Sequence, residues 1–222
     1  MKVAIRLSLL VLIAFAQFSA AQMGMGMGRA PSMAGVFSPE VGSGGAYEVL
    51  RKDENQKTNF EVAVIGKEGP GYWIEYTMQS PHGTVYAKSL NAREGDNVMV
   101  QKMIVQMPGR PPMDMGSMMK AHAMQSEESK ADMRANAENL GTETITTPAG
   151  TFSCQHWRSK KDGSEYWLSD KVSPWKLVKM TNKDQTMTLT KVITDAKTHI
   201  TGTPVSMEDM MKGMGNMGQR PQ

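Results

Sequence analysis

The sequence predicts a mainly β fold: a single curved antiparallel sheet, or open half-barrel, with one helix on or near its concave face. Three observations carry this prediction. Apolar and polar residues alternate along most of the segment 46–204. Gly- and Pro-containing turns separate the alternating runs, and one stretch near 127–140 spaces its apolar residues as a helix does. Alternation with a period of two is typical of strands that bury one face.

The first part of the segment predicts consecutive strands joined by tight turns. The runs are "NFEVAVI", "GYWIEYTM", "TVYAKSL" and "NVMVQKMIVQM". In the second run, one face carries Tyr72, Ile74, Tyr76 and Met78. In the fourth, one side carries Met99, Met103, Val105 and Met107. Gly-Pro-Gly at 69–71 and Ser-Pro-His-Gly at 80–83 supply the turn residues, so we expect successive antiparallel hairpins.

A helix is predicted after a connection rich in Met and Pro. Ser126 can cap its first turn, and two acidic residues follow where the positive end of the helix dipole stabilises them. Met133, Ala137 and Leu140 recur at helical spacing, and Gly141 is a plausible stop. Because this apolar stripe is thin, we expect the helix to lie on a surface rather than to form a core.

A second group of strands follows the predicted helix, in "TETITTPAGTFSCQHWR", "SEYWLS" and "QTMTLTKVI". Thr147-Pro148-Ala149-Gly150 predicts a hairpin turn between the first two of these strands. Pro148 fixes φ at the first corner, and Gly150 can adopt the left-handed conformation that closes the turn. A closed β-sandwich is the competing architecture for the same order of elements.

The two ends of the chain differ in composition from the strand-rich segment 46–204. A basic start, an apolar run from Leu7 to Phe18 and small residues at 19–21 predict a signal peptide over 1–21, cleaved near Ala21. The mature chain is then exported, to the periplasm or the extracellular space. Residues 22–45 predict a disordered Met- and Gly-rich leader, 46–204 the β-rich half-barrel domain, and 205–222 a disordered Met-rich tail.

Charge and cysteine content exclude several classes of function. Removing residues 1–21 takes away Lys2 and Arg6, which leaves 23 basic against 22 acidic residues. No basic block remains, and clustered phosphate contacts are what nucleic-acid binding requires, so we expect no nucleic-acid partner. No stretch after residue 21 is long and apolar enough to predict a membrane-spanning helix. The single cysteine, Cys154, cannot form an internal disulfide, so stability has to come from a packed core.

One part of the sequence carries a family resemblance. "TPAGTFSCQHW", followed by "EYWLSDKVSPWKLVKM", resembles an uncharacterised exported bacterial family whose shape is similar to the LolA/LolB lipoprotein-carrier half-barrel. "GYWIEYTM" and "MIVQMPGRPPM" look like the front half of the same family. The resemblance spans roughly 46–204 and implies a concave apolar surface for an acyl chain or another apolar ligand. It transfers no set of ligand-contacting residues.

The sequence contains no motif typical of an enzyme. It lacks a Gly-x-Ser-x-Gly elbow, a His-Glu-x-x-His pair, a phosphate-binding glycine loop and a paired-cysteine metal motif. Cys154 and His156 share a strand face with Phe152, a spacing that could in principle hold a metal. The stronger interpretation is a buried, unreactive thiol, because free cysteine packs as a small apolar residue. We expect His156 to lie nearer the strand end and water.

Methionine is the compositional anomaly, with 22 residues in the chain, most of them in segments that read as loops. Thioethers bind Cu(I), and Met-x-Met spacing would let neighbouring sulfurs chelate it. The residues of such a site would be Met23, Met25, Met27, Met113, Met115, Met118, Met119 and His122. The favoured alternatives are a plastic apolar flap at 107–124, near the mouth of the half-barrel, or compositional drift in disordered tails.

We therefore expect a non-enzymatic exported protein of carrier-like fold, with no cofactor. It would bind an apolar small molecule, a lipid or an envelope protein. The candidate ligand-binding residues are Tyr72, Tyr76, Met99, Met103, Met107, Met113 and Met115. The alternative is a Met-rich protein that binds or buffers Cu(I), in which case the metal is the one cofactor.

Overall fold

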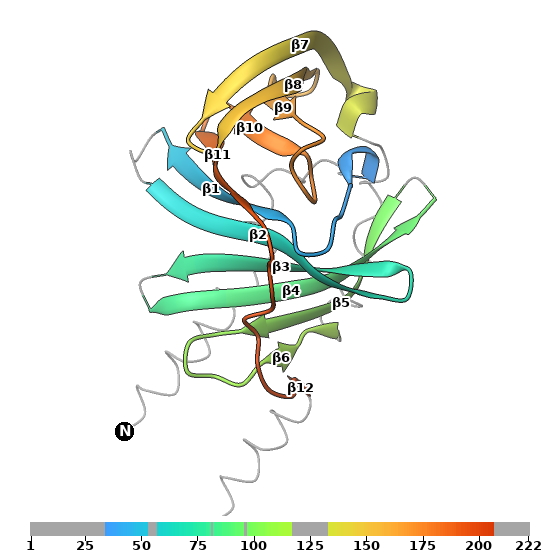
Figure 1. The fold of residues 1–222 in the computed structure, drawn as a ribbon, viewed down its shortest axis with the longest axis vertical. Coiled ribbons are helices and arrows are strands. Elements are labelled where there is room, and N and C mark those ends of the chain that lie inside the picture. The colour runs from blue at the N-terminus through green and yellow to red at the C-terminus, as the bar shows by residue number, and fades with distance from the viewer. Residues whose placement is uncertain (1–33, 53–56, 81, 96, 117–132, 207–222) are drawn as a thin grey trace, which may run out of the picture. The chain divides into compact units, whose positions relative to one another are not determined.

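The computed structural model describes residues 34–52, 57–80, 82–95, 97–116 and 133–206. These residues form one open sheet of 12 strands, in the order β12-β6-β5-β4-β3-β2-β1-β11-β10-β9-β8-β7 (Figure 1). The sheet is antiparallel except where β12 pairs with β6. Its predicted β character is therefore confirmed.

The first group of strands follows the chain in order. It comprises β1 (Gly44–Arg51), β2 (Lys57–Glu68), β3 (Gly71–Ser80), β4 (Gly83–Glu94), β5 (Asn97–Gln106) and β6 (Met113–Asp114). Gly69 and Gly83 have positive φ values, of 55° and 118°, at the predicted turns. Such backbone conformations suit glycine because it has no Cβ.

The second group comprises β7 (Ala137–Thr147), β8 (Gly150–Ser159), β9 (Glu165–Leu168), β10 (Leu177–Thr181) and β11 (Gln185–Ile193). The predicted turn at Pro148-Ala149 is confirmed, because Thr147 pairs with Gly150, whose φ is 129°. The strand β1 pairs with β2 on one side and with β11 on the other. This pairing joins the two groups into one sheet and places β1 and β11 near its centre, whereas β12 lies at one edge.

The predicted helix near 127–140 is wrong for the residues that the structure describes. Residues 133–136 form a 3-10 turn, η2 (Met133–Asn136), and residues 137–140 begin β7. A thin apolar stripe gains little as a helix, whereas pairing with β8 satisfies the backbone hydrogen bonds of the same residues. Gly141, with φ of 98°, follows a bulge in β7 rather than ending a helix. Residues 127–132 lie outside the described part of the chain.

The fold extends beyond the predicted domain limits of 46–204. In the N-terminal direction it includes η1 (Ala34–Val36), and Val36 and Phe37 are buried, so the described residues 34–45 do not behave as the predicted leader. In the other direction, β12 (Val205–Ser206) pairs with β6. A glycine-rich segment can still be ordered when its few apolar residues enter the core. Residues 1–33 and 207–222 lie outside the described residues, as do the predicted signal peptide and most of the predicted tail.

Strand register defines the two faces of the sheet. Tyr47, Tyr72 and Tyr76 lie on one face, which we call the tyrosine face. Tyr47 pairs with Phe60 and Phe60 with Met78, and paired residues point to the same side of a sheet. Tyr76 and Tyr72 share that side because they alternate with Met78 along β3. The opposite face carries Glu61, Glu75 and Lys191. Residues 194–204, which we call the strap, cross this opposite face on the way from β11 to β12 (Figure 1). We therefore call this face the strap face.

Loops, rather than a helix, cover part of the tyrosine face. The Ser38 N–H donates to the Pro174 carbonyl at 2.7 Å, which joins residues 34–43 to residues 169–176. The Tyr47 hydroxyl donates to the Leu177 carbonyl at 2.8 Å. The Phe37 ring lies 5.0 Å from Trp175 and 6.3 Å from Tyr72, measured between ring centroids. These two loops therefore take the place in which the sequence predicted a helix.

Candidate functional site

The strand register brings most of the predicted ligand-binding residues onto the tyrosine face. Tyr76 pairs with Ala87, Ala87 with Val105, and Val105 with Met113. One row further along the strands, Ile74 pairs with Ser89 and Ser89 with Met103. Tyr72 lies two residues before Ile74 on β3. Side chains from β3, β4, β5 and β6, which are neighbours in the sheet, thus form one mostly apolar surface.

Met99 is the exception, because a bulge in β5 reverses its side. Leu90 pairs with Lys102 whereas Asn91 pairs with Val100, so Gln101 is an extra residue in β5. An extra residue shifts the alternation by one. The expectation that Met99 and Met103 share a face is therefore wrong: Met103 lies on the tyrosine face, whereas Met99 lies on the strap face and is 46% exposed.

The remaining predicted residues lie beside β5 and β6. Met113 is buried in the core. Met115 is half-buried, and its N–H donates to the Met103 carbonyl at 2.9 Å. Met107 is half-buried immediately after the end of β5. Met103 and Met115 are thus neighbours across β5 and the residue after β6, at the edge of the same apolar surface.

Burial differs along the tyrosine face. In β9 to β11 its side chains, such as Met180 and Leu189, are fully buried. In β2 to β5 several apolar side chains remain half-buried, and Val100 is 42% exposed. The half-buried set consists of Phe60, Tyr72, Tyr76, Met78 and Met103. We call this set, together with Val100 and Met115, the half-exposed patch.

Tyr76 lies at the boundary between the covered part of the face and this patch. Burial raises the pKa of the Tyr76 phenol to about 12, and a hydrogen bond from the Trp175 side chain opposes this rise. The neutral hydroxyl is the form that suits an apolar surface, because removing a charge from water is costly. Tyr76 therefore acts in its neutral form, as an apolar ring with a polar tip.

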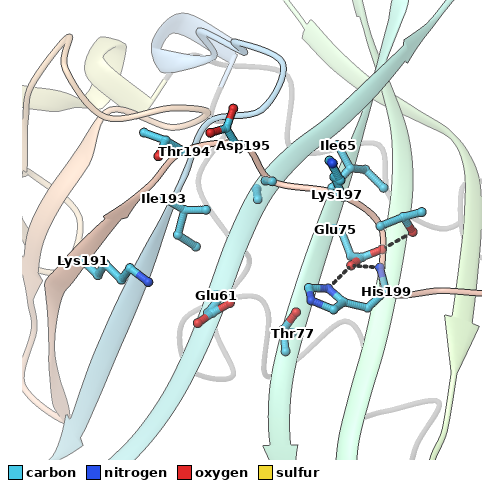
Figure 2. Close-up of a pocket in the computed structure, with 13 residues that line it drawn as sticks. Glu61, Ile65, Glu75, Thr77, Lys191, Ile193, Thr194, Asp195, Lys197 and His199 are labelled. Atoms are coloured by element: carbon cyan, nitrogen blue, oxygen red, sulfur yellow. Dashed lines mark hydrogen bonds and ion pairs between the residues drawn. The ribbon is translucent and has the colours of Figure 1, made fainter.

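The strap face carries a second candidate site, a pocket beneath the strap (Figure 2). Its cavity volume is about 370 Å³. Glu75 forms its best-defined feature: this carboxylate is 3% exposed and accepts hydrogen bonds from the Thr198 hydroxyl at 2.6 Å and the His199 N–H at 2.9 Å. Its Oε1 also lies 2.8 Å from Nδ1 of His199. The His199 ring stacks on Tyr86, with 5.0 Å between centroids.

These contacts assign Glu75 a structural role as the anchor of the strap. A buried carboxylate needs hydrogen-bond donors, and the strap supplies them. The pocket is otherwise lined by exposed charges of both signs, including Glu61, Lys191 and Lys197, above a few small or apolar residues. Figure 2 shows Glu61 on β2 and Lys191 on β11 at the lower side of this opening. In the described residues, no group of three or more His, Cys, Asp or Glu side chains could hold a metal ion.

Cys154 and His156 confirm one prediction and correct another. Cys154 is free and buried, and burial followed by the nearby Glu143 charge raises its pKa to about 11. His156, expected near water, is instead held between two carboxylates: Nδ1 lies 3.3 Å from Glu143 and Nε2 3.1 Å from Glu165. Its ring stacks on Trp167 at 4.3 Å. Sequence spacing could not show this, because Glu143 and Trp167 come from strands on either side of β8.

The copper hypothesis involves residues that the structure mostly does not describe. Met23, Met25, Met27, Met118, Met119 and His122 all lie outside the described ranges. Met113 is 7% exposed, so its thioether already packs against protein. Met115 is half-buried and follows the same face. The binding of Cu(I) therefore stays a prediction about segments beyond the described residues.

Comparison with known proteins gives only loose similarity. No family model and no curated protein sequence matches the chain. One similar solved structure is MucB, with 7% identity over 77% of this chain and 60% of that one, and a TM-score of 0.44. MucB in complex with MucA(peri) aligns with 8% identity over 74% of this chain and 54% of that one, with a TM-score of 0.42. A candidate lipoprotein from Parabacteroides distasonis aligns at 16% identity over 73% of this chain and 99% of that one, with a TM-score of 0.32.

The chain thus spans between half and two thirds of the length of the MucB chains it matches. Alignments this loose carry no argument about ligand or partner. No helix in the described ranges is long and apolar enough to cross a membrane. The site has to be interpreted from its own side chains.

Proposed function

We propose that this chain is a non-enzymatic exported protein of carrier-like fold that holds an apolar, lipid-like ligand on its tyrosine face. The observation that carries the proposal is the half-exposed patch on β2 to β5. A sheet face that is sealed at one end and left half-open at the other offers apolar surface without a complete protein cover. Contiguous exposed apolar surface of this kind is typical of binding sites.

The composition of the patch suits an alkyl chain better than a polar substrate. Tyrosine provides a flat ring with a polar tip, and methionine provides a flexible thioether that adapts to the shape of its neighbour. Covering one half-buried Tyr or Met side chain contributes about 1 kcal/mol when its remaining apolar surface leaves water. Several such side chains lie in adjacent rows, so their contributions add along one ligand.

The same patch offers little for catalysis. Besides the Tyr72 and Tyr76 hydroxyls, the uncharged polar groups in its rows are Ser89 and Asn91. The Asn91 side chain already donates to the Ser89 hydroxyl at 2.7 Å and to the Ser89 carbonyl at 2.9 Å. Both residues are buried. A satisfied amide–hydroxyl pair is a structural feature of a sheet face, whereas a nucleophile needs an adjacent base. This supports a binding function rather than an enzymatic one.

Two methionines on opposite faces of β5 provide the test. Met103→Gln places a polar amide in the patch, whereas Met99→Gln makes the same change on the strap face. We expect Met103→Gln to weaken binding of the neutral apolar dye Nile red roughly 5-fold, the equivalent of about 1 kcal/mol, and Met99→Gln to leave it unchanged. Fluorescence titration measures both affinities.

Equal effects of the two substitutions, or no dye binding by the wild-type chain, would contradict the proposal. Mass spectrometry of molecules that co-purify from the native host provides the second measurement. A lipid in the purified protein is the expected result. A protein that carries no lipid but co-purifies with one envelope protein would replace the lipid proposal with a protein-partner function.

A further inference from the structure

The tyrosine face changes its chemistry along the strand direction. The row of Phe60, Met78 and Val85 and the row of Val62, Tyr76, Ala87 and Val105 are apolar. The row of Val64, Ile74, Ser89 and Met103 adds one hydroxyl. The next row contains Lys67, Tyr72, Asn91 and Val100. From Met78 to Tyr72 the distance along β3 is about 20 Å, at about 3.3 Å per residue.

Two cationic side chains lie at the polar end of these rows. The Lys67 ammonium lies 5.3 Å from the centroid of the Tyr72 ring. Arg93 lies two residues after Asn91 on β4, and its guanidinium donates to the Phe37 carbonyl at 3.0 Å. Because the Phe37 ring contacts the Tyr72 ring, both cations flank the same aromatic pair. Both residues are exposed.

The carboxylate next to Lys67 in sequence does not neutralise it. Glu68 lies on the strap face, where Lys102 and the Trp73 N–H hydrogen-bond to it and hold its pKa below the usual range. Lys67 forms no ion pair with any residue in the described ranges. Among the described residues, two cationic side chains, Lys67 and Arg93, therefore lie at this end of the patch on its own face.

We propose that the ligand of the tyrosine face is an anionic amphiphile, whose alkyl chain lies along the apolar rows and whose carboxylate or phosphate head lies between Lys67 and Arg93. This inference rests on the proposed function. Opposite charge at the polar end and apolar surface over about 20 Å are the complementary halves of such a molecule.

The experiment compares four ligands that share one alkyl chain: laurate, lauryl phosphate, lauryl alcohol and laurylamine. Each displaces Nile red from the wild-type chain and from two variants. Lys67→Gln removes the charge over Tyr72. Lys88→Gln is the matched control, because the Lys88 ammonium lies 5.4 Å from the Trp73 ring in an equivalent arrangement on the strap face.

We expect Lys67→Gln to weaken laurate and lauryl phosphate about 5-fold, the usual size of one exposed charge pair, and to leave lauryl alcohol unchanged. Lys88→Gln should change none of the affinities. Added NaCl should weaken the two anions and not the alcohol, because salt screens exposed charges. The stronger binder of the two anions identifies carboxylate or phosphate as the preferred head group.

Three results would overturn the inference. If lauryl alcohol or laurylamine binds the wild-type chain as tightly as the anions, the patch is apolar without a head-group site, and the proposed function survives alone. If Lys67→Gln weakens the alcohol as much as laurate, Lys67 acts through packing rather than charge. If none of the four ligands binds, the proposed function fails, and this inference fails with it.

Discussion

Two parts of the tyrosine face carry similar side chains, but these side chains are fully buried in one part and half-exposed in the other. In β9 to β11 and β1, Met180, Leu189 and Tyr47 are between 0% and 2% exposed. In β2 to β5, Met103, Met78 and Tyr72 stay half-buried. Residue type alone does not distinguish the parts, since Met and Tyr occur in both. The difference lies in how deeply tertiary packing buries them, so solvent exposure rather than residue type separates core from candidate site.

The largest expected effect is a difference in stability between two methionines. Met180→Ala should lower the free energy of unfolding by about 3 kcal/mol, because it leaves a cavity in close-packed surroundings. Met103→Ala should cost less than about 1 kcal/mol, since water can reach the space it leaves. Urea denaturation of both variants measures these values. Similar losses at the two positions would show that β5 belongs to the core and would remove the distinction between the two parts.

An intermediate effect on stability is expected at alkaline pH from two tyrosines of this face, the buried Tyr47 and the half-buried Tyr76. Burial raises the pKa of Tyr47, and it raises the pKa of Tyr76 to about 12, above the ordinary phenol value of 10.0. The unfolded chain loses these protons first, so stability should be unaffected below about pH 10 and should fall as pH rises toward 12. Replacing Tyr76 by Phe should reduce this alkaline loss in the free energy of unfolding by about 1 to 2 kcal/mol, because Phe has no proton to lose.

Denaturation of the wild type and Tyr76→Phe at a series of pH values between neutral and strongly alkaline measures that difference. Tyr47→Phe serves as the comparison from the covered part of the face, with the added loss of the hydrogen bond to the Leu177 carbonyl at neutral pH. If the Tyr76→Phe variant and the wild type lose the same free energy of unfolding at alkaline pH, the Tyr76 hydroxyl is already solvated. Tyr76 then belongs wholly to the half-exposed patch.

The smallest effect concerns Cys154, outside both parts of the tyrosine face. Its raised pKa and burial leave little thiolate at neutral pH, so a thiol reagent should label the native chain slowly and the denatured chain at once. The rate should rise with pH as the pH approaches about 11. Rapid labelling of the native protein at neutral pH would mean that β7 and β8 open easily and that Cys154 is not part of a stable core.

Several features followed from the sequence alone. Alternation predicted the faces of β3, and the Pro148-Ala149 turn and the buried Cys154 were also read correctly. These depend on local rules: side chains alternate along a strand, and turns need particular residues. Alternation also predicts that Tyr72 and Tyr76 share one face of β3, and that Met103 and Val105 share one face of β5.

Tertiary structure alone decided the rest. The sequence placed Met99 beside Met103, but the bulge at Gln101 depends on pairing with β4 and reverses it. The sequence predicts a helix over residues 133–140, but β8 pairs with residues 137–139 of this segment. It also predicts a disordered leader at 34–45, but Val36 and Phe37 are buried in the core. Lys67, Arg93 and Glu75 gained roles only when distant strands and the strap met them. Local sequence sets which side a residue faces, whereas register, covering loops and charge neighbours depend on contacts between residues far apart in the chain.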